Sequence, residues 1–225
     1  MIIRLGMAPR REGLDFEEFQ RHWRTSHADV VSYLPGLRRY QQFHAALDGG
    51  KPLLPYPGFD ACSALRFDTA DAMEAAFESD EFVNAVVADE AEFVDKTRFQ
   101  CVVGAWRADN DADLGFAGPV HVLTLMTAEP GTSPDELAGR FSGVPHGTSA
   151  GAIVADHDVH AGRFPVAADV VRIVGYADIA SALDGAEATR DVAGPARIVG
   201  EHLARVVDVP LGESSTGQQN ERTKA

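Results

Sequence analysis

Apolar positions recur with two different periods along the first hundred residues, and these periods predict which segments are strands and which are helices. Apolar runs with the alternation of strands lie at residues 2–8, 37–45, 59–67 and 97–106. Steps of three and four between apolar residues predict helices at residues 15–34, 69–77 and 81–93. The order is β-α-β-β-α-β, which is the split βαβ or ferredoxin-like arrangement of an α+β domain.

The first predicted helix has clear start and stop signals. Asp15 is followed three residues later by Glu18, which is the spacing of a capping box, and Pro35-Gly36 ends the pattern. His27 lies on the apolar stripe of this helix, four residues after Trp23, so the two side chains point the same way from consecutive turns. The helix is therefore expected to present an imidazole and an indole on its inner face.

The second half of the chain repeats this order of elements with little residue identity. A polar, glycine-containing linker is followed by an apolar strand, a helix start capped by Ser133, and then strand, strand, helix and strand patterns. The sequence therefore predicts two ferredoxin-like domains, at residues 1–107 and 118–211. Residues 212–225 contain no core former and are predicted to be a disordered tail.

The two predicted sheets each need a partner. A four-stranded sheet with both helices on one face leaves its other face uncovered, and that face must be buried against something. Two such sheets packed face to face make a barrel-like enclosure, and one chain that holds both makes the pairing intramolecular. We therefore expect tandem ferredoxin-like repeats, in a monomeric pseudo-dimer or a homodimer, with a small-molecule site in the space between the sheets.

Composition narrows the range of partners. The 225 residues include 20 Lys and Arg against 34 Asp and Glu, a formal net charge of −14. Such a protein repels phosphate backbones and anionic lipid heads, so neither nucleic acid nor a membrane surface is an expected partner. No apolar run reaches membrane-spanning length and no signal-peptide pattern is present, so a cytoplasmic location is expected. Cys62 and Cys101 are predicted to be buried thiols.

Several motifs in the first half resemble the EthD family of the dimeric α+β barrel superfamily. They are F-x3-W-x3-H-A from Phe19, the turn P-G-L-R-R-Y-x-Q that follows it, F-D at Asp60, and D-E-x2-F-x-D from Asp89 to Asp95. Methylmuconolactone methylisomerases look related, because they too place a histidine shortly before a P-G-L turn. The second half resembles the family only in its order of elements.

The resemblance implies an α+β barrel that acts without a cofactor on a small, often cyclic or aromatic, organic substrate. This sequence has Ala64 where many members carry a glutamate, and Arg66 where an aromatic residue is common. A mechanism built on that glutamate is therefore not expected, and histidine chemistry is favoured. The leading hypothesis is a cofactor-independent lyase or isomerase of catabolism or secondary metabolism. A cofactor-free monooxygenase and a non-catalytic binding or carrier protein are the alternatives.

The strand after the first helix carries a polar face that suits proton transfer. Alternation puts Tyr40, Gln42 and His44 on one side of it. An imidazole gives or accepts a proton near neutral pH, and a phenol donates to a carbonyl or enolate oxygen. His27, Tyr40 and His44 are therefore the predicted catalytic residues. The alternatives are that His27 is a core histidine and that the polar side of the strand meets water.

Five further residues are candidate substrate contacts, namely Trp23, Gln42, Tyr56, Asp60 and Arg66. Tyr56 lies in a proline-rich loop, from which it can cover the mouth of a cavity. Asp60 has a structural alternative, which is an ion pair with Arg4 or Arg38. The choice between these roles depends on where the loop places the two side chains.

Other polar residues are interpreted as structural. His22 and the acidic residues between 89 and 95 are expected to form solvated helix faces and a cap. His121, His157 and His160 lie in the second half, and the last two are three residues apart. In a strand that spacing points the side chains to opposite faces, so no metal site is expected.

Overall fold

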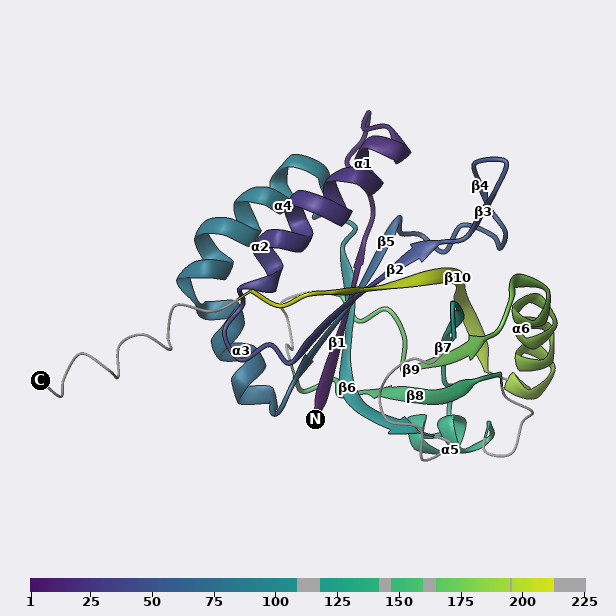
Figure 1. Ribbon diagram of the computed structural model, residues 1–225. Coiled ribbons are helices and arrows are strands. Elements are labelled where there is room, and N and C mark those ends of the chain that lie inside the picture. The colour runs from purple at the N-terminus through teal and green to yellow at the C-terminus, as the bar shows by residue number, and fades with distance from the viewer. Residues whose placement is uncertain (109–117, 142–146, 160–164, 195, 213–225) are drawn as a thin grey trace, which may run out of the picture.

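The computed structural model describes residues 1–108, 118–141, 147–159, 165–194 and 196–212, which form a closed eight-stranded barrel with helices on its outside. The strands run around the barrel in the order β1-β5-β2-β10-β7-β9-β8-β6, and neighbours are antiparallel. In Figure 1 helices α1 to α4 lie together on one side of the barrel, apart from α5 and α6. The predicted α+β fold of tandem ferredoxin-like units is therefore confirmed.

The first half supplies four barrel strands and a layer of helical segments. The strands are β1 (Ile2–Ala8), β2 (Arg39–Ala45), β5 (Ala61–Phe67) and β6 (Gln100–Ala108), with a small hairpin of β3 (Leu47–Asp48) and β4 (Lys51–Pro52) after β2. The helical segments are α1 (Phe16–His22), η1 (Trp23–His27), α2 (Ala28–Ser32), α3 (Ala70–Glu78), η2 (Glu81–Val86) and α4 (Val87–Phe93).

The second half repeats this order in fewer residues. Its elements are β7 (Val120–Thr127), α5 (Pro134–Gly139), β8 (Ser149–Ala155), β9 (Val170–Tyr176), α6 (Ile179–Ala193) and β10 (Arg197–Val209). Its strand order, β10-β7-β9-β8, matches the order β6-β1-β5-β2 of the first half. Ser133 caps α5 with the predicted capping box. The domain limits stay a prediction, since residues 109–117 and 213–225 lie outside the described residues.

The two halves are joined along two seams between edge strands. At one seam β10 pairs with β2, and Arg39 Nε donates to Asp208 Oδ1 at 2.7 Å. At the other seam β6 pairs with β8. A Cβ atom on Gly104 would lie 1.9 Å from the carbonyl oxygen of Val154 there, so the backbones approach too closely for any other residue. The barrel therefore closes within one chain.

The space inside the barrel is filled mainly by apolar side chains, with a few buried polar ones such as Arg66 and Gln41. One cluster of buried residues takes members from all eight barrel strands. Because side chains alternate along β2, Phe43 points into the barrel while Tyr40, Gln42 and His44 point to the helices. The expectation of a ligand site between the sheets, reached from His27, is therefore wrong for the described part of the chain. The polar strip of β2 exists, but it faces the helix layer.

The predicted first helix is divided into three segments. Residues 23–27 form a π-helical turn between α1 and α2. A π-turn holds more residues than an α-turn, so the apolar stripe shifts by one position beyond it. Val31 is buried, where an unbroken helix would have buried Val30, and His27 and Ala28 both turn inward. Single π-turns of this kind are frequent at functional sites.

Candidate active site

A cavity between the first sheet and its helices contains His27. Strands β1, β2 and β5 contribute Arg4, Tyr40 and Ser63 to its wall, and η1, η2 and α4 cover it from the other side. Its volume is about 30 Å³, which is enough for one water molecule. Most of the remaining wall is aliphatic or aromatic, so polar groups are few.

His27 is held in this cavity by a carboxylate from α4. Its side chain is 8% exposed, and its Nδ1 lies 2.8 Å from Oδ2 of Asp89. The other carboxylate oxygen, Oδ1, lies 2.7 Å from Nε2 of His22, whose side chain is 29% exposed. Phe93 packs against both imidazole rings. One carboxylate therefore joins an imidazole in the cavity to an imidazole nearer the surface.

Asp89 is ionised at neutral pH. Burial alone raises the pKa of its carboxyl, but hydrogen bonds from His27 and His22 outweigh this effect and hold the pKa below its usual value. A carboxylate only accepts hydrogen bonds, so each imidazole presents an N–H to it. In neutral His27 that N–H is at Nδ1, which leaves the lone pair on Nε2. Nε2 is thus the atom that can accept a proton from a ligand in the cavity.

Tyr40 is the second polar group in a position to act on a ligand. Gln42 Nε2 donates to the Tyr40 hydroxyl oxygen at 2.8 Å and to the carbonyl oxygen of Trp23 at 2.8 Å. Burial raises the pKa of Tyr40 to about 12. The phenol therefore stays protonated at neutral pH. Because its oxygen already accepts from Gln42, its O–H can donate to an oxygen atom of a ligand.

His44 does not line the cavity. Its Nε2 lies 3.0 Å from Oε1 of Gln42, and its Nδ1 lies 2.7 Å from Oε1 of Gln20. Burial lowers the pKa of His44 to about 3, so the ring is neutral at neutral pH. The structure therefore separates the three predicted catalytic residues. His27 and Tyr40 line one cavity. His44 contacts Gln42, which in turn contacts Tyr40.

Two charged residues of the cavity wall were not predicted from the sequence. The guanidinium of Arg4 lies 4.5 Å from the centroid of the Phe77 ring and 5.5 Å from that of Phe99. Glu90, from α4, is buried and forms an ion pair with Lys96. The cavity therefore combines an aromatic wall with a fixed positive charge and a fixed negative charge.

The interpretation of His22, Asp89 and Glu90 as solvated helix faces is wrong. The side chain of Asp89 is 12% exposed because α4 turns it toward η1, and Glu90 is buried on the same helix. The D-E pair inside the EthD-like motif was the available signal. The two histidines that contact Asp89 are more than sixty residues earlier in the chain, and the packing of α4 against η1 cannot be read from spacing.

Trp23 lies in the cavity wall, and Arg66 lies elsewhere. Trp23 Nε1 donates to Ser63 Oγ at 3.2 Å, which fixes the indole over β5. Arg66 Nη2 donates to Gln41 Oε1 at 3.2 Å inside the barrel. The two residues were predicted to contact one substrate. Only Trp23 is placed where the His27 cavity can use it.

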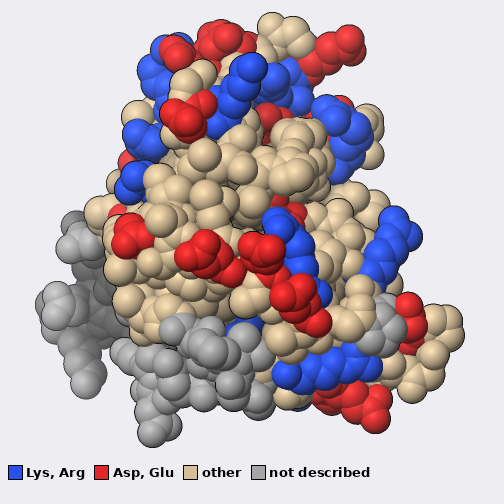
Figure 2. Space-filling model, turned by 90° about the vertical axis from the view of Figure 1, so that its right-hand side faces the viewer, with Lys and Arg blue, Asp and Glu red and all other residues tan. Residues whose placement is uncertain are grey.

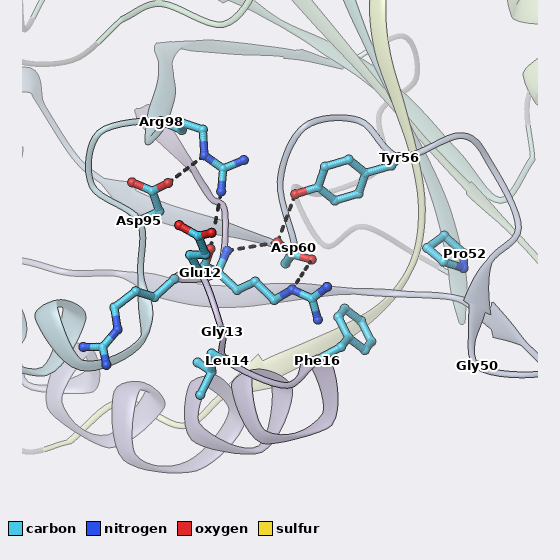
Figure 3. A pocket seen from close by; sticks show the side chains of 12 residues that line it. Glu12, Gly13, Leu14, Phe16, Gly50, Pro52, Tyr56, Asp60, Asp95 and Arg98 are labelled. Atoms are coloured by element: carbon cyan, nitrogen blue, oxygen red, sulfur yellow. Dashed lines mark hydrogen bonds and ion pairs between the residues drawn. The ribbon is translucent and has the colours of Figure 1, made fainter.

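Tyr56 and Asp60 line a separate groove, shown in Figure 3. The Tyr56 hydroxyl donates to Asp60 Oδ2 at 3.0 Å. The cation nearest to Asp60 is Arg10, with Nε 3.7 Å from Oδ1, and not Arg4 or Arg38 as considered from the sequence. The proline-rich loop therefore brings these side chains together at a site that the His27 cavity does not include.

The described residues contain no group of three side chains that could hold a metal ion. His157 Nε2 lies 3.0 Å from Asp169 Oδ1, and His160 lies outside the described residues. Cys62 and Cys101 are free and buried, as predicted. Burial raises the pKa of both thiols, so neither is a reactive thiolate at neutral pH.

A family comparison agrees with the motifs of the first half. The family described as EthD domain matches residues 11–97. The first half of the chain is therefore similar to EthD domains. The matched segment contains His27, Tyr40 and Asp89, and the second ferredoxin-like unit lies beyond it. No curated protein matches the sequence.

Solved structures share the fold of the whole chain, including the EthD-like segment and the second unit. An anthrone oxidase-like protein has 13% identity and a TM-score of 0.57, over 92% of this chain and 91% of its own. A candidate chlorite dismutase has 12% identity and a TM-score of 0.55, over 93% and 96%. A candidate monooxygenase from Lactobacillus acidophilus NCFM has 12% identity and a TM-score of 0.50, over 92% and 93%. At such low identities the likeness shows the fold alone.

On the face shown in Figure 2, basic and acidic side chains are intermixed, with uncharged areas between them. Among the described helices, none is both long enough and apolar enough to cross a membrane.

Proposed function

We propose that this protein is an enzyme that transfers a proton on a small organic molecule, without a cofactor, in the cavity between the first sheet and its helices. The observation that carries the proposal is the pairing of His27 with Asp89 on the wall that also contains Tyr40. It supplies a base, a group that orients the base, and a neutral hydrogen-bond donor in one enclosed space.

In the proposed mechanism His27 Nε2 removes a proton from a carbon atom next to a carbonyl group. The electron pair moves to the carbonyl oxygen, where the Tyr40 hydroxyl donates a hydrogen bond to the developing enolate. The resulting imidazolium is stabilised by the Asp89 carboxylate 2.8 Å away. Return of the proton to another atom gives an isomerase, and loss of a leaving group gives a lyase.

The size of the cavity sets a condition on this proposal. A volume of about 30 Å³ is far below the roughly 300 Å³ of an ordinary ligand pocket. A substrate must therefore displace part of the wall. The wall on the helix side includes Phe82 and Val86 of the second π-helical segment, η2, which contacts α2. Movement of this segment away from the sheet is the proposed route of entry.

A cofactor-free monooxygenase is the main alternative. The same base would form a carbanion that reacts with O₂, and two structures of this fold carry the names anthrone oxidase-like and monooxygenase. A carrier that binds a reactive intermediate is the second alternative, because a closed apolar cavity also suits storage. Oxygen uptake during turnover favours the oxygenase. Ligand binding that survives loss of His27, without any product, favours the carrier.

The test uses hydrogen exchange, because it needs no knowledge of the product. The protein is incubated in D₂O with small lactones, cyclic ketones and phenols, and loss of their acidic C–H signals is followed by NMR. We expect catalysed exchange that falls about a hundredfold or more in His27→Ala. His157→Ala, which changes an exposed histidine of the second half, is the matched control and should keep the wild-type rate. Full exchange in His27→Ala would end the proposal.

A further inference from the structure

The groove that contains Tyr56 and Asp60 lies outside the proposed active site. Its volume is about 720 Å³, and it is formed by the segment after β1, the loop that follows β3 and the turn before β6. It shares no lining residue with the His27 cavity. Two backbone hydrogen bonds, from Arg11 N to Phe93 O and from Asp95 N to Pro9 O, join the segments that lie between the two pockets. The volume is in the range of small-molecule sites.

Asp60 is the buried acceptor of this groove. It is 7% exposed, and its Oδ2 accepts hydrogen bonds from the backbone N–H of Arg10 at 2.9 Å and from the Tyr56 hydroxyl at 3.0 Å. Figure 3 shows Tyr56 directed at this carboxylate. Oδ1 makes no hydrogen bond to any described residue, since its nearest cation, Arg10 Nε, is 3.7 Å away. Because Asp60 lines the groove, this oxygen can accept a hydrogen bond from a donor on a ligand.

Arg10 is the matching donor. Its side chain is 39% exposed, and its guanidinium lies 5.7 Å from the centroid of the Phe16 ring, a stacking position. The guanidinium makes no hydrogen bond to the described residues, because the contact with Asp60 is longer than a hydrogen bond. Its planar donors are therefore available to a carboxylate. The groove thus presents a carboxylate and a guanidinium side by side in a long ion pair, and both can still form hydrogen bonds with a ligand.

The charges of the groove balance. Its wall contains three arginines and three carboxylates: Arg10, Arg11, Arg98, Glu12, Asp60 and Asp95. Arg98 Nε is already paired with Asp95 Oδ2 at 2.6 Å, and Arg11 and Glu12 are exposed to solvent, so the remaining enclosed charges are those of Arg10 and Asp60. A groove whose positive and negative charges balance does not favour binding of a simple anion or a simple cation. It favours a ligand that carries both charges a few ångströms apart.

We propose that this groove binds a small zwitterion of the α-amino acid type with an apolar side chain. The ammonium donates to Asp60 Oδ1 and the carboxylate accepts from the guanidinium of Arg10. The two groups of such a ligand are separated by one carbon atom, which suits partners 3.7 Å apart. The rings of Phe16 and Tyr56, the latter 54% exposed, are the surfaces on which the apolar side chain packs.

The experiment compares three probes that differ only in their charged groups. L-Phenylalanine, phenethylamine and 3-phenylpropionate are each titrated into the full-length protein and followed by two-dimensional ¹H–¹⁵N NMR. We expect saturable shifts at residues of the groove with phenylalanine, and binding at least about tenfold weaker with each probe that lacks one charge. Equal binding of all three probes, or no saturable shift with phenylalanine, overturns the proposal.

Variants separate the two contacts. Asp60→Asn and Arg10→Met are each expected to weaken phenylalanine binding about tenfold or more. Asp68→Asn, which changes an exposed carboxylate that is paired with Arg38 outside the groove, is the control and should bind as the wild type does. Arg10→Met keeps the fold because the side chain is partly exposed, so it decides the matter if Asp60→Asn does not fold. Unchanged binding in Arg10→Met contradicts the proposal.

Discussion

The carboxylate of Asp89 lies 2.8 Å from Nδ1 of His27, across the interface between α4 and η1. This contact determines which nitrogen of the imidazole faces a ligand. An acceptor at Nδ1 keeps the proton there and leaves the lone pair at Nε2. The same carboxylate contacts His22, which is nearer to the surface. The chemistry proposed for the cavity therefore depends on a residue outside its lining.

Replacement of Asp89 by Asn tests this dependence. The amide of Asn can donate an N–H to Nδ1, which favours the tautomer whose proton is at Nε2 and removes the base from the cavity. We expect the rate of proton exchange to fall about a hundredfold. The rate of exchange and the ¹⁵N shifts of His27 measure the loss of the base and the change of tautomer.

A neighbour on the same helix provides the control for Asp89. Glu92 is exposed on α4, so Glu92→Gln removes one negative charge from the same helix without touching the imidazoles. It should keep the wild-type rate and the wild-type tautomer. If the Asp89→Asn variant keeps the Nδ1–H tautomer of His27 and the wild-type rate of proton exchange, Asp89 has no positioning role. That result would leave the role of His27 itself open to the His27→Ala test.

Replacement of Tyr40 by Phe tests the hydrogen bond to the developing oxyanion. The ring is fully buried and packs with residues of α2 and α3, so Tyr40→Phe keeps its shape in the core. We expect a loss of about a hundredfold in kcat, with a smaller change in KM, because the hydrogen bond strengthens in the transition state. Since the pKa of Tyr40 is raised to about 12, the wild-type profile should show no tyrosine ionisation below pH 9, roughly.

Tyr33 is the control for this substitution. It lies at the end of α2 and is 42% exposed, so Tyr33→Phe removes a phenol that does not face the cavity. It should be as active as the wild type. Equal activity of Tyr40→Phe and Tyr33→Phe would mean that no charge develops near the Tyr40 hydroxyl.

The fold was predictable because strands and helices have different apolar periods. The eight barrel strands alternate or run apolar in sequence, and the repeated order of elements implied the closed sheet. The alternation of β2 also grouped Tyr40 with Gln42 correctly. Alternation cannot show which of the two buried faces of a strand contacts a ligand. Both faces of β2 are covered here, one by the barrel core and one by helices.

The site was predictable only in part, because its contacts depend on how helices pack. The stripe containing Trp23 and His27 was visible in the sequence, but the π-turn that shifts the stripe to Ala28 and Val31 was not. In the sequence, Asp89 looks like the exposed aspartates and glutamates around it. Only its neighbours in the folded protein distinguish it from them. Asp60 and Arg10 are fifty residues apart and meet through two loops, whose paths have no periodic signal.

The stability of the protein should depend on pH through His44. Its pKa falls from an ordinary 6.5 to about 3 because the ring is buried. Between those two values the unfolded chain binds a proton that the folded protein does not, so stability decreases as pH falls. One such group contributes a slope of about 1.4 kcal/mol per pH unit. Chemical denaturation at several pH values should give a shallower slope for His44→Gln than for the wild type.

His157 provides the comparison for His44. Its side chain is 51% exposed and lies beside Asp169 at the surface, so His157→Gln should leave the slope between pH 4 and 6 within about 0.5 kcal/mol per pH unit of the wild type. His202, whose pKa is also lowered by burial, remains in both variants and contributes equally. An unchanged slope in His44→Gln would mean that the ring is protonated in the folded protein, with both neighbouring glutamine oxygens as acceptors.

Closure of the barrel between β6 and β8 should depend on Gly104. A methyl group there would lie 1.9 Å from the carbonyl oxygen of Val154, and this oxygen belongs to the backbone, so the strands must separate. We expect Gly104→Ala to lower the free energy of unfolding by about 3 kcal/mol, the upper end of the cost of overpacking. Gly139→Ala is the control, because nothing lies within 4 Å of its added Cβ and alanine favours the helix. Equal midpoints of urea denaturation for the two variants would contradict this prediction. They would show that β6 and β8 do not approach each other as closely as the Gly104–Val154 contact requires.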